Sequence, residues 1–145
     1  MLTGKKILIG ISGGIAAYKT PLLIRQLIKR GCQVKIVATH NALEFVTLTT
    51  LRTLSQHNVY YDMFSNEGEY STEHISLTDW ADCFIIAPAT ANIIGKYANG
   101  IADDALSTSL LAFDKEIFLA PAMNTKMYNN SIVQENINKI AKRGV

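Results

Sequence analysis

The chain has 145 residues, of which 48% are hydrophobic and 18% are charged, and its formal net charge is +2. This length suits one compact domain, the apolar content excludes a disordered chain, and the small net charge without a basic stretch argues against nucleic-acid binding. No apolar run approaches the roughly 18 residues that span a membrane, and the first residues lack a signal-peptide pattern. We therefore expect one cytoplasmic domain.

Four short apolar runs of strand length occur along the chain, at residues 7–11, 34–38, 84–87 and 116–120. Their apolar residues follow one another without alternation, which is typical of strands buried on both faces of a parallel sheet. Amphipathic helical patterns separate the runs. Strands that alternate with helices predict right-handed βαβ units, so we expect an α/β fold with a parallel sheet inside a three-layer αβα sandwich.

The first helical stripe lies within residues 23–28, and Pro21 precedes it. Because proline fits the first turn of a helix but not its interior, the helix either starts near Thr20 or begins at Ile15 and kinks. A second amphipathic pattern covers residues 41–54. Both patterns favour helices that cover the sheet.

Two further helical regions follow later in the chain. Residues 91–112 indicate one or two helices broken near Gly100. Ser131 and Gln134 have the spacing of a capping box, which predicts a helix over residues 132–143.

The first strand leads into a glycine-rich turn, Gly-Ile-Ser-Gly-Gly-Ile at residues 10–15. Such a turn between a first strand and a first helix places bare backbone N–H groups where a phosphate can bind, and Ser12 could add a hydroxyl donor. The turn matches neither the dinucleotide fingerprint nor the nucleotide-triphosphate loop. A tight turn without a ligand is the alternative interpretation.

Polar residues also follow the second strand. Thr39 could donate a hydrogen bond to a ligand, because strand ends line the crevice of doubly wound sheets. Phe45 could pack on an aromatic ring of the ligand. Alternatively, Thr39 caps a helix and Phe45 belongs to the core.

The third and fourth runs both end in Ala-Pro-Ala and then reach an asparagine, at residues 87–92 and 120–124. This recurrence suggests two similar turns that face one crevice. Asn124 can donate its amide N–H groups to a carboxylate, and Met123 and Met127 can line an apolar pocket.

Between these runs, residues 58–79 are polar and aperiodic and predict a long loop that carries His74. A loop of that length in a compact domain is usually functional. His74 is either a catalytic acid or base or an ordinary surface histidine. Asp103 and Asp104 either cap the next helix, which is the favoured interpretation, or bind a ligand.

Taken in order, these motifs resemble the homo-oligomeric flavin-containing cysteine decarboxylases. Tyr128, together with Ala-Tyr-Lys after the glycine turn, favours the coenzyme A branch over relatives that act on peptides. The resemblance implies a flavodoxin-like (Rossmann-like) fold, FMN as cofactor, and trimers or dodecamers with flavin at a subunit boundary. It extends over nearly the whole chain, in segments 10–19, 39–46, 74–82, 87–92, 100–104 and 121–128.

The resemblance also implies roles for individual residues. His74 would be the active-site base, acting on flavin held by a neighbouring copy, and Asn124 would hold the substrate carboxylate. The other substrate contacts would be Ala122, Met123 and Met127. The implied FMN contacts are Ser12, Gly13, Gly14, Ile15, Thr39, Phe45, Pro88, Ala89, Thr90, Asn92 and Ser107.

The implied reaction is decarboxylation of 4'-phospho-N-pantothenoylcysteine to 4'-phosphopantetheine. Oxidation of the cysteine CH2–SH to a thioaldehyde creates an electron sink β to the carboxylate, so CO2 leaves and an enethiolate remains; the redox chemistry belongs to the cofactor. The alternatives are a non-catalytic flavoprotein or regulatory subunit and, less favoured, a flavin prenyltransferase or a peptidyl-cysteine decarboxylase.

One departure from the family concerns the reductive half of this reaction. The family uses a cysteine in a flap that follows the Pro-Ala-Met-Asn motif, whereas Cys32 and Cys83 lie in other motifs. We therefore expect residues 1–145 to form a flavin-binding core that lacks the last strand, predicted to begin at Val145, and the flap. Such a core would stop at the enethiol.

Overall fold

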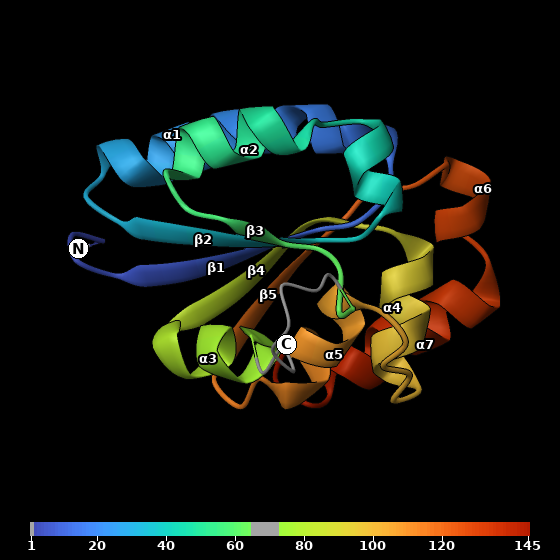
Figure 1. Cartoon of the computed structure of the whole chain (residues 1–145). Helices are drawn as coiled ribbons and strands as arrows, with labels where there is room; N and C mark the ends of the chain where they lie inside the picture. Colours follow the sequence, from blue (N-terminus) through green and yellow to red (C-terminus); the bar gives the residue numbers. More distant parts are fainter. Residues whose placement is uncertain (1, 65–72) are drawn as a thin grey trace.

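The structure is a computed structural model that describes residues 2–64 and 73–145. Its centre is one sheet whose neighbouring strands are all parallel, in the order β3-β2-β1-β4-β5 (Figure 1). The strands are β1 (Lys6–Ile11), β2 (Gln33–Ala38), β3 (Val59–Tyr60), β4 (Cys83–Ala89) and β5 (Glu116–Pro121).

Helices cover both faces of this sheet. In Figure 1, α1 and α2 lie on one face, α3, α4, α5 and α7 lie on the other, and α6 lies beside the sheet. The α-helices are α1 (Thr20–Lys29), α2 (Leu48–Ser55), α3 (Glu73–Trp80), α4 (Ala91–Ala98), α5 (Ala105–Ala112), α6 (Thr125–Tyr128) and α7 (Ser131–Ala141). Two short 3-10 helices, η1 (Ile15–Lys19) and η2 (Asn41–Glu44), follow β1 and β2.

The strand order confirms the predicted three-layer αβα sandwich with a parallel sheet. The chain moves outward from β1 through β2 to β3 and then returns to place β4 on the other side of β1. This order is that of the Rossmann variant of doubly wound sheets, and it puts a topological switch point between β1 and β4. A ligand crevice is expected at the carboxyl ends of those two strands.

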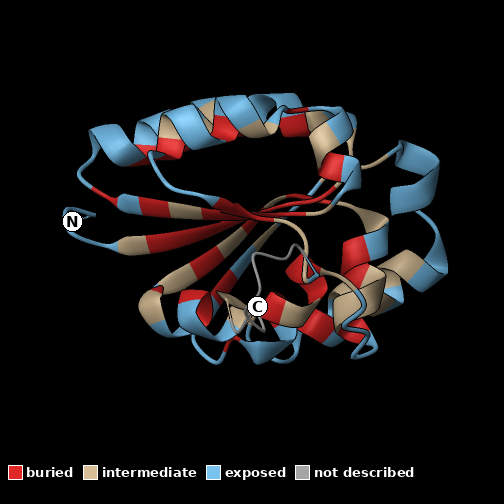
Figure 2. Cartoon of the chain, viewed as in Figure 1, coloured by how far each residue is buried: buried red, intermediate tan, exposed pale blue. Residues whose placement is uncertain are grey.

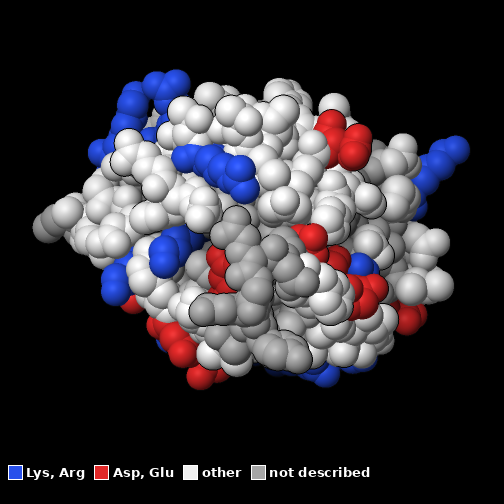
Figure 3. Space-filling model, viewed as in Figure 1, with Lys and Arg blue, Asp and Glu red and all other residues white. Residues whose placement is uncertain are grey.

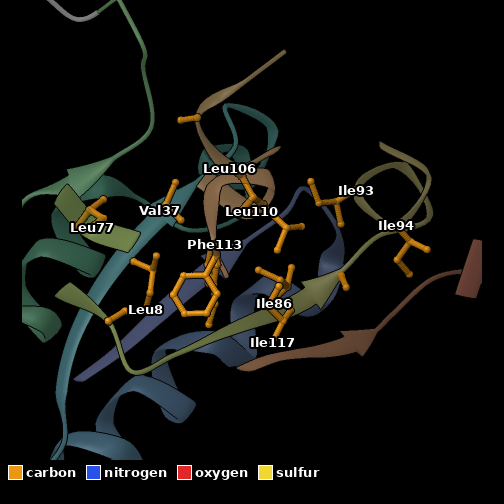
Figure 4. Packing of buried hydrophobic residues seen from close by; sticks show 14 of the residues in the cluster. Leu8, Val37, Leu77, Ile86, Ile93, Ile94, Leu106, Leu110, Phe113 and Ile117 are labelled. Carbon is orange, nitrogen blue, oxygen red and sulfur yellow. The ribbon is translucent and has the colours of Figure 1, made fainter. Parts of the chain in front are cut away.

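Two apolar layers hold the sandwich together, one on each face of the sheet, and the burial bands of Figure 2 follow the strands and the inner helix faces. Figure 4 shows the layer beneath α3, α4 and α5, where Leu8 and Ile86 from the sheet meet Leu106 and Phe113. Each such fully buried side chain contributes about 1.5–3 kcal/mol relative to an exposed one. These layers make a rigid frame for the strand ends.

Several local predictions are confirmed. The helix with Pro21 starts at Thr20, so the proline lies in its first turn, and η1 precedes it as a separate element. The region 91–112 forms two helices, and Gly100 between them has a positive φ of 70°. Asp104 is the N-cap of the second of these helices, as favoured from its position.

The predicted loop over residues 58–79 is wrong in two places. Val59–Tyr60 form β3, which is too short to show a periodic pattern, and Glu73–Trp80 form α3. His74 therefore lies in the first turn of a helix, and residues 65–72 of the predicted loop lie outside the described residues. The apolar side of α3 is short, with Leu77 and Thr78 buried, so its pattern was too weak to be recognised.

The predicted capping box at the last helix is also wrong. Asn130, not Ser131, caps α7, because its side chain accepts a hydrogen bond from Ile132 N–H. Gln134 donates its side-chain N–H to the carbonyl of Tyr128 at 2.6 Å. Asparagine caps helices as well as serine does, so the cap can lie one residue earlier than predicted. At its other end the helix stops at Ala141 rather than at residue 143.

Both charge signs occur on the face drawn in Figure 3. Within residues 2–64 and 73–145, no group of three or more histidine, cysteine or acidic side chains could hold a metal ion. None of the described helices is long and apolar enough to cross a bilayer.

Candidate functional site

A cleft of about 880 Å³ lies at the carboxyl ends of the strands, where the switch point predicts it. Its walls come from the turns after β1, β2, β4 and β5, so segments distant in sequence meet here. The lining residues are Ser12, Gly13, Gly14, Ile15, Ala16, Thr39, His40, Asn41, Thr90, Ala91, Asn92, Ile93, Lys96, Asp104, Ala122, Met123, Asn124 and Met127.

The turns after β1 and β4 are joined directly through Ser12. The Ser12 hydroxyl donates to the carbonyl of Pro88 at 2.6 Å and accepts from the N–H of Thr90 at 3.0 Å. Beside it, the Thr20 hydroxyl donates to the carbonyl of Ala87 at 2.8 Å. Two hydroxyls therefore hold two consecutive carbonyls at the carboxyl end of β4. This end of the strand and the residues that follow it, 87–92, are called the β4 turn below.

The turn after β2 approaches the glycine turn closely. Thr39 accepts a hydrogen bond from Ala42 N–H at 3.1 Å through its hydroxyl oxygen, which leaves the hydroxyl proton for another acceptor. A Cβ atom at Gly13 would lie 2.4 Å from Cβ of Asn41 and 3.0 Å from its backbone carbonyl carbon. Only glycine at this position permits the two turns to pack.

We expect Gly13→Ala to lower the free energy of unfolding by about 1–3 kcal/mol, because the added methyl group overlaps backbone that cannot rotate away. Gly14→Ala is the matched control, since its Cβ would be 3.3 Å from a methyl of Thr90 and needs only a small adjustment. Urea unfolding measures both variants. Equal stability of the two would contradict the close approach at Gly13.

The two Ala-Pro-Ala turns lie side by side, as their recurrence suggested. The N–H of Ala122 donates to the carbonyl of Ala89 at 3.1 Å, which extends the β4–β5 pairing into the turns. Asn124 follows as the N-cap of α6 and accepts a hydrogen bond from Lys126 N–H at 2.8 Å through Oδ1. Its side-chain N–H groups remain for a ligand in the cleft.

An ion-pair cluster forms the charged part of the cleft wall. The Lys96 ammonium lies 2.8 Å from a carboxylate oxygen of Asp103 and 3.0 Å from one of Asp104. Asp104 Oδ1 also accepts hydrogen bonds from the backbone N–H and the hydroxyl of Ser107, both at 2.7 Å. Burial alone would raise the pKa of Asp104, but these hydrogen bonds and Lys96 outweigh it and hold the pKa below its usual value of 3.8.

This lowered pKa makes the contribution of Asp104 to stability dependent on pH. A depressed pKa stabilises the fold above the unfolded value near 3.8, and that stabilisation is lost as pH falls through the folded value. We expect Asp104→Asn, which keeps a capping oxygen, to be less stable than the wild type at pH 7 and to approach it at pH 3. Urea unfolding at both values measures this; a difference that is independent of pH would contradict the assignment.

Some residues implied by the family resemblance lie outside the cleft of their own chain. His74 is half-buried in the first turn of α3, and Phe45 is exposed at the end of η2. Ser107 is buried in the capping box with Asp104. Pro88 and Ala89 support the cleft through their carbonyl groups.

Other cleft residues were missed by sequence reasoning. Lys96 lies one helical turn after Asn92, and this i, i+4 spacing could have placed it on the same face of α4. His40 follows Thr39 directly, and its ring lies edge-on to Tyr61 with centroids 5.7 Å apart. The remaining additions are Ala16, Asn41, Ala91 and Ile93. Asp104, for which capping and ligand binding were the two alternatives, is the N-cap of α5 and also lines the cleft.

Comparison with protein-family models matches residues 1–145 to the flavoprotein family. The chain belongs to the flavoprotein family. Curated relatives include the coenzyme A biosynthesis bifunctional protein CoaBC of Bacillus subtilis (strain 168), 46% identical over 144 residues, and that of Haemophilus influenzae (strain ATCC 51907 / DSM 11121 / KW20 / Rd), 48% identical over 144 residues. Each match covers 99% of this chain, whereas the chain spans only 36% of the length of these relatives.

Several solved structures have a similar fold. The FMN-dependent cysteine decarboxylase SpaF has a TM-score of 0.91 and 29% identity, covering 99% of this chain and 83% of its own. A PPC decarboxylase mutant complexed with pantothenoylaminoethenethiol has a TM-score of 0.82 and 32% identity, covering 97% of this chain and 79% of its own. The FMN binding protein AtHal3 has a TM-score of 0.82 and 31% identity, covering 97% of this chain and 77% of its own.

Proposed function

We propose that this flavoprotein binds FMN in the cleft and decarboxylates 4'-phospho-N-pantothenoylcysteine, a step of coenzyme A biosynthesis. The observation that carries the proposal is the position of Asn124, whose unused amide N–H groups share one cleft with the glycine turn. A carboxylate acceptor and a phosphate-bearing cofactor can therefore meet in this cleft. The similarity to CoaBC and to PPC decarboxylase supports this choice of substrate.

The described residues fit FMN. Gly13 and Gly14 bring bare backbone to the cleft, and an α-helix leaves its first N–H groups without intrahelical partners. Thr90 caps one of these groups in α4, that of Ile93, which leaves the N–H groups of Ala91 and Asn92, two residues that line the cleft, as candidate donors to an anion. The cleft volume lies within the range of about 300–1,000 Å³ for small-molecule sites.

When bound, FMN supplies the hydride acceptor and donor of this reaction. Asn124 donates to the substrate carboxylate and fixes its orientation, while Met123 and Met127 exclude water from the departing CO2. His74 moves the proton as general acid or base. Cys32 and Cys83 lie at the amino ends of β2 and β4, away from the cleft, so neither supplies a thiol there.

We further propose that copies of this chain associate as trimers or dodecamers, with the cleft at the subunit boundary and His74 contributed by a neighbour. The cleft rim supports this, since Ile15 and Met127 line it with 71% and 48% of their surface exposed. Tyr18 in η1 and Leu22 in α1 are also exposed. Apolar surface that adjoins a cleft is typical of an interaction site.

The purified protein tests this function. We expect a visible flavin absorption band, and CO2 release with 4'-phospho-N-pantothenoylcysteine. The same substrate without its phosphate and a peptide ending in cysteine are the comparison arms, and product mass distinguishes an enethiol from a thiol. A folded protein that binds no FMN, or one that releases CO2 only from the peptide, would overturn the proposal.

A further inference from the structure

We propose that Ser12 is a positioning residue, whose hydroxyl holds the β4 turn in place, and that it is not a hydrogen-bond donor to the phosphate of the cofactor. Ser12 lies in the glycine turn and lines the cleft, so a direct contact would be the ordinary expectation. This inference rests on the proposed binding of FMN. It concerns how the cleft is held open for that ligand.

The hydrogen bonds of Ser12 account for its only proton. Pro88 offers a carbonyl oxygen, which can only accept, so Ser12 must be the donor in the 2.6 Å hydrogen bond between them. The N–H of Thr90 can only donate, so Ser12 is the acceptor in the 3.0 Å hydrogen bond. An ionised phosphate needs a donor, and the Ser12 hydroxyl has no second proton to offer.

Burial strengthens this assignment. Ser12 is only 2% exposed, and a buried hydroxyl that gave up these partners would leave the carbonyl of Pro88 and the N–H of Thr90 without them. Thr90 in turn caps α4 by accepting from Ile93 N–H at 3.3 Å. The hydroxyl of Ser12 therefore sets the position of the first turn of α4, whose residues line the cleft.

Thr20 performs the same task one residue earlier and allows a clean test. Its hydroxyl donates to the carbonyl of Ala87 at 2.8 Å, yet Thr20 is not among the residues that line the cleft and lines a second, smaller pocket beside it. Thr20 is only 3% exposed, and the proton of its hydroxyl is already donated to Ala87. Any effect of Thr20 on flavin binding must pass through the β4 turn.

The experiment compares Ser12→Ala, Thr20→Val and the wild type. Titration with FMN and, separately, with riboflavin gives the dissociation constants. We expect both variants to bind FMN about tenfold more weakly than the wild type, which corresponds to about 1.4 kcal/mol. We also expect the ratio of FMN affinity to riboflavin affinity to be the same in the two variants. Thr53→Val is the matched control, because it removes a hydroxyl that bonds to the carbonyl of Thr49 within α2.

A loss of FMN affinity in Ser12→Ala while Thr20→Val binds like the wild type would overturn the inference, because Ser12 would then act on the ligand directly. Unchanged affinity in both variants would overturn it as well. If Ser12→Ala does not fold, Thr20→Val decides alone: weaker binding supports the inference and unchanged binding refutes it.

Amide hydrogen exchange of Thr90 tests the hydrogen bond without any flavin. We expect Thr90 to exchange faster in Ser12→Ala than in the wild type, and an unchanged rate would refute the role of Ser12. If the wild type binds no FMN, the proposed function is wrong. The exchange rate of Thr90 still shows in that case whether Ser12 holds the β4 turn.

Discussion

His74→Asn is expected to lower the rate of CO2 release by about 10²–10⁴-fold, the usual contribution of a general acid or base, while FMN stays bound. The reason for this separation is structural. His74 lies in α3, outside the cleft of its own chain, so its loss leaves every residue that lines that cleft in place. Flavin absorbance and CO2 release from 4'-phospho-N-pantothenoylcysteine are measured on the same preparation.

The matched control for this variant is His57→Asn, which changes another histidine, after α2, that does not line the cleft. We expect His57→Asn to release CO2 like the wild type. Retained activity in His74→Asn would show that another group moves the proton. Loss of flavin together with activity would show that His74 supports the fold or the cofactor instead.

Asn124→Asp is expected to lower kcat/KM by about 10²-fold or more, with little change in stability or FMN binding. Aspartate keeps the Oδ1 oxygen that accepts from Lys126 N–H, and it caps helices as well as asparagine. It lacks the N–H groups that would donate to the substrate carboxylate, and its own charge repels that carboxylate. The substitution thus separates capping from substrate binding.

Asn129→Asp provides the control for added charge, because Asn129 ends the same short helix, α6, without lining the cleft. We expect this control to keep wild-type kcat/KM, and melting curves report on folding in both variants. If Asn124→Asp turned over substrate like Asn129→Asp, the carboxylate would have to bind elsewhere.

Mixing the two inactive variants tests whether each active site is shared between copies. When His74→Asn and Asn124→Asp chains co-assemble, a site formed by Asn124 of one chain and His74 of its neighbour is intact. We therefore expect the mixture to regain part of the activity that each variant lacks alone. No recovery in a co-assembled mixture would place both groups in the same chain.

The sequence was most informative where a local pattern has a local cause. Continuous apolar runs identified four strands, because short runs of uniform hydrophobicity are typical of strands buried on both faces of a parallel sheet. Pro21 and Asp104 marked helix starts through their own backbone and side-chain preferences. The glycine turn at residues 10–15 was recognisable as bare backbone, but its close approach to Asn41 at Gly13 was not, because the two residues are distant in sequence.

Tertiary structure decided what the residues of the site do. Ser12 looks like a ligand donor in the sequence, but its proton is used by Pro88, 76 residues away. Lys96 looks like an ordinary helix surface residue, but two carboxylates that directly precede α5 hold it in the cleft wall. His74 was placed in a loop because the pattern of α3 is weak, and α3 keeps it out of the cleft.

The sequence by itself thus determined the layered fold, several of its turns and helix starts, and which strand ends carry polar residues. These features depend on hydrophobic periodicity and on the conformational limits of proline and glycine. Only the tertiary structure decided which of those polar groups remain available to a ligand. Hydrogen bonds between residues far apart in the chain occupy donors and acceptors. A local sequence pattern does not show which donors and acceptors are occupied in this way.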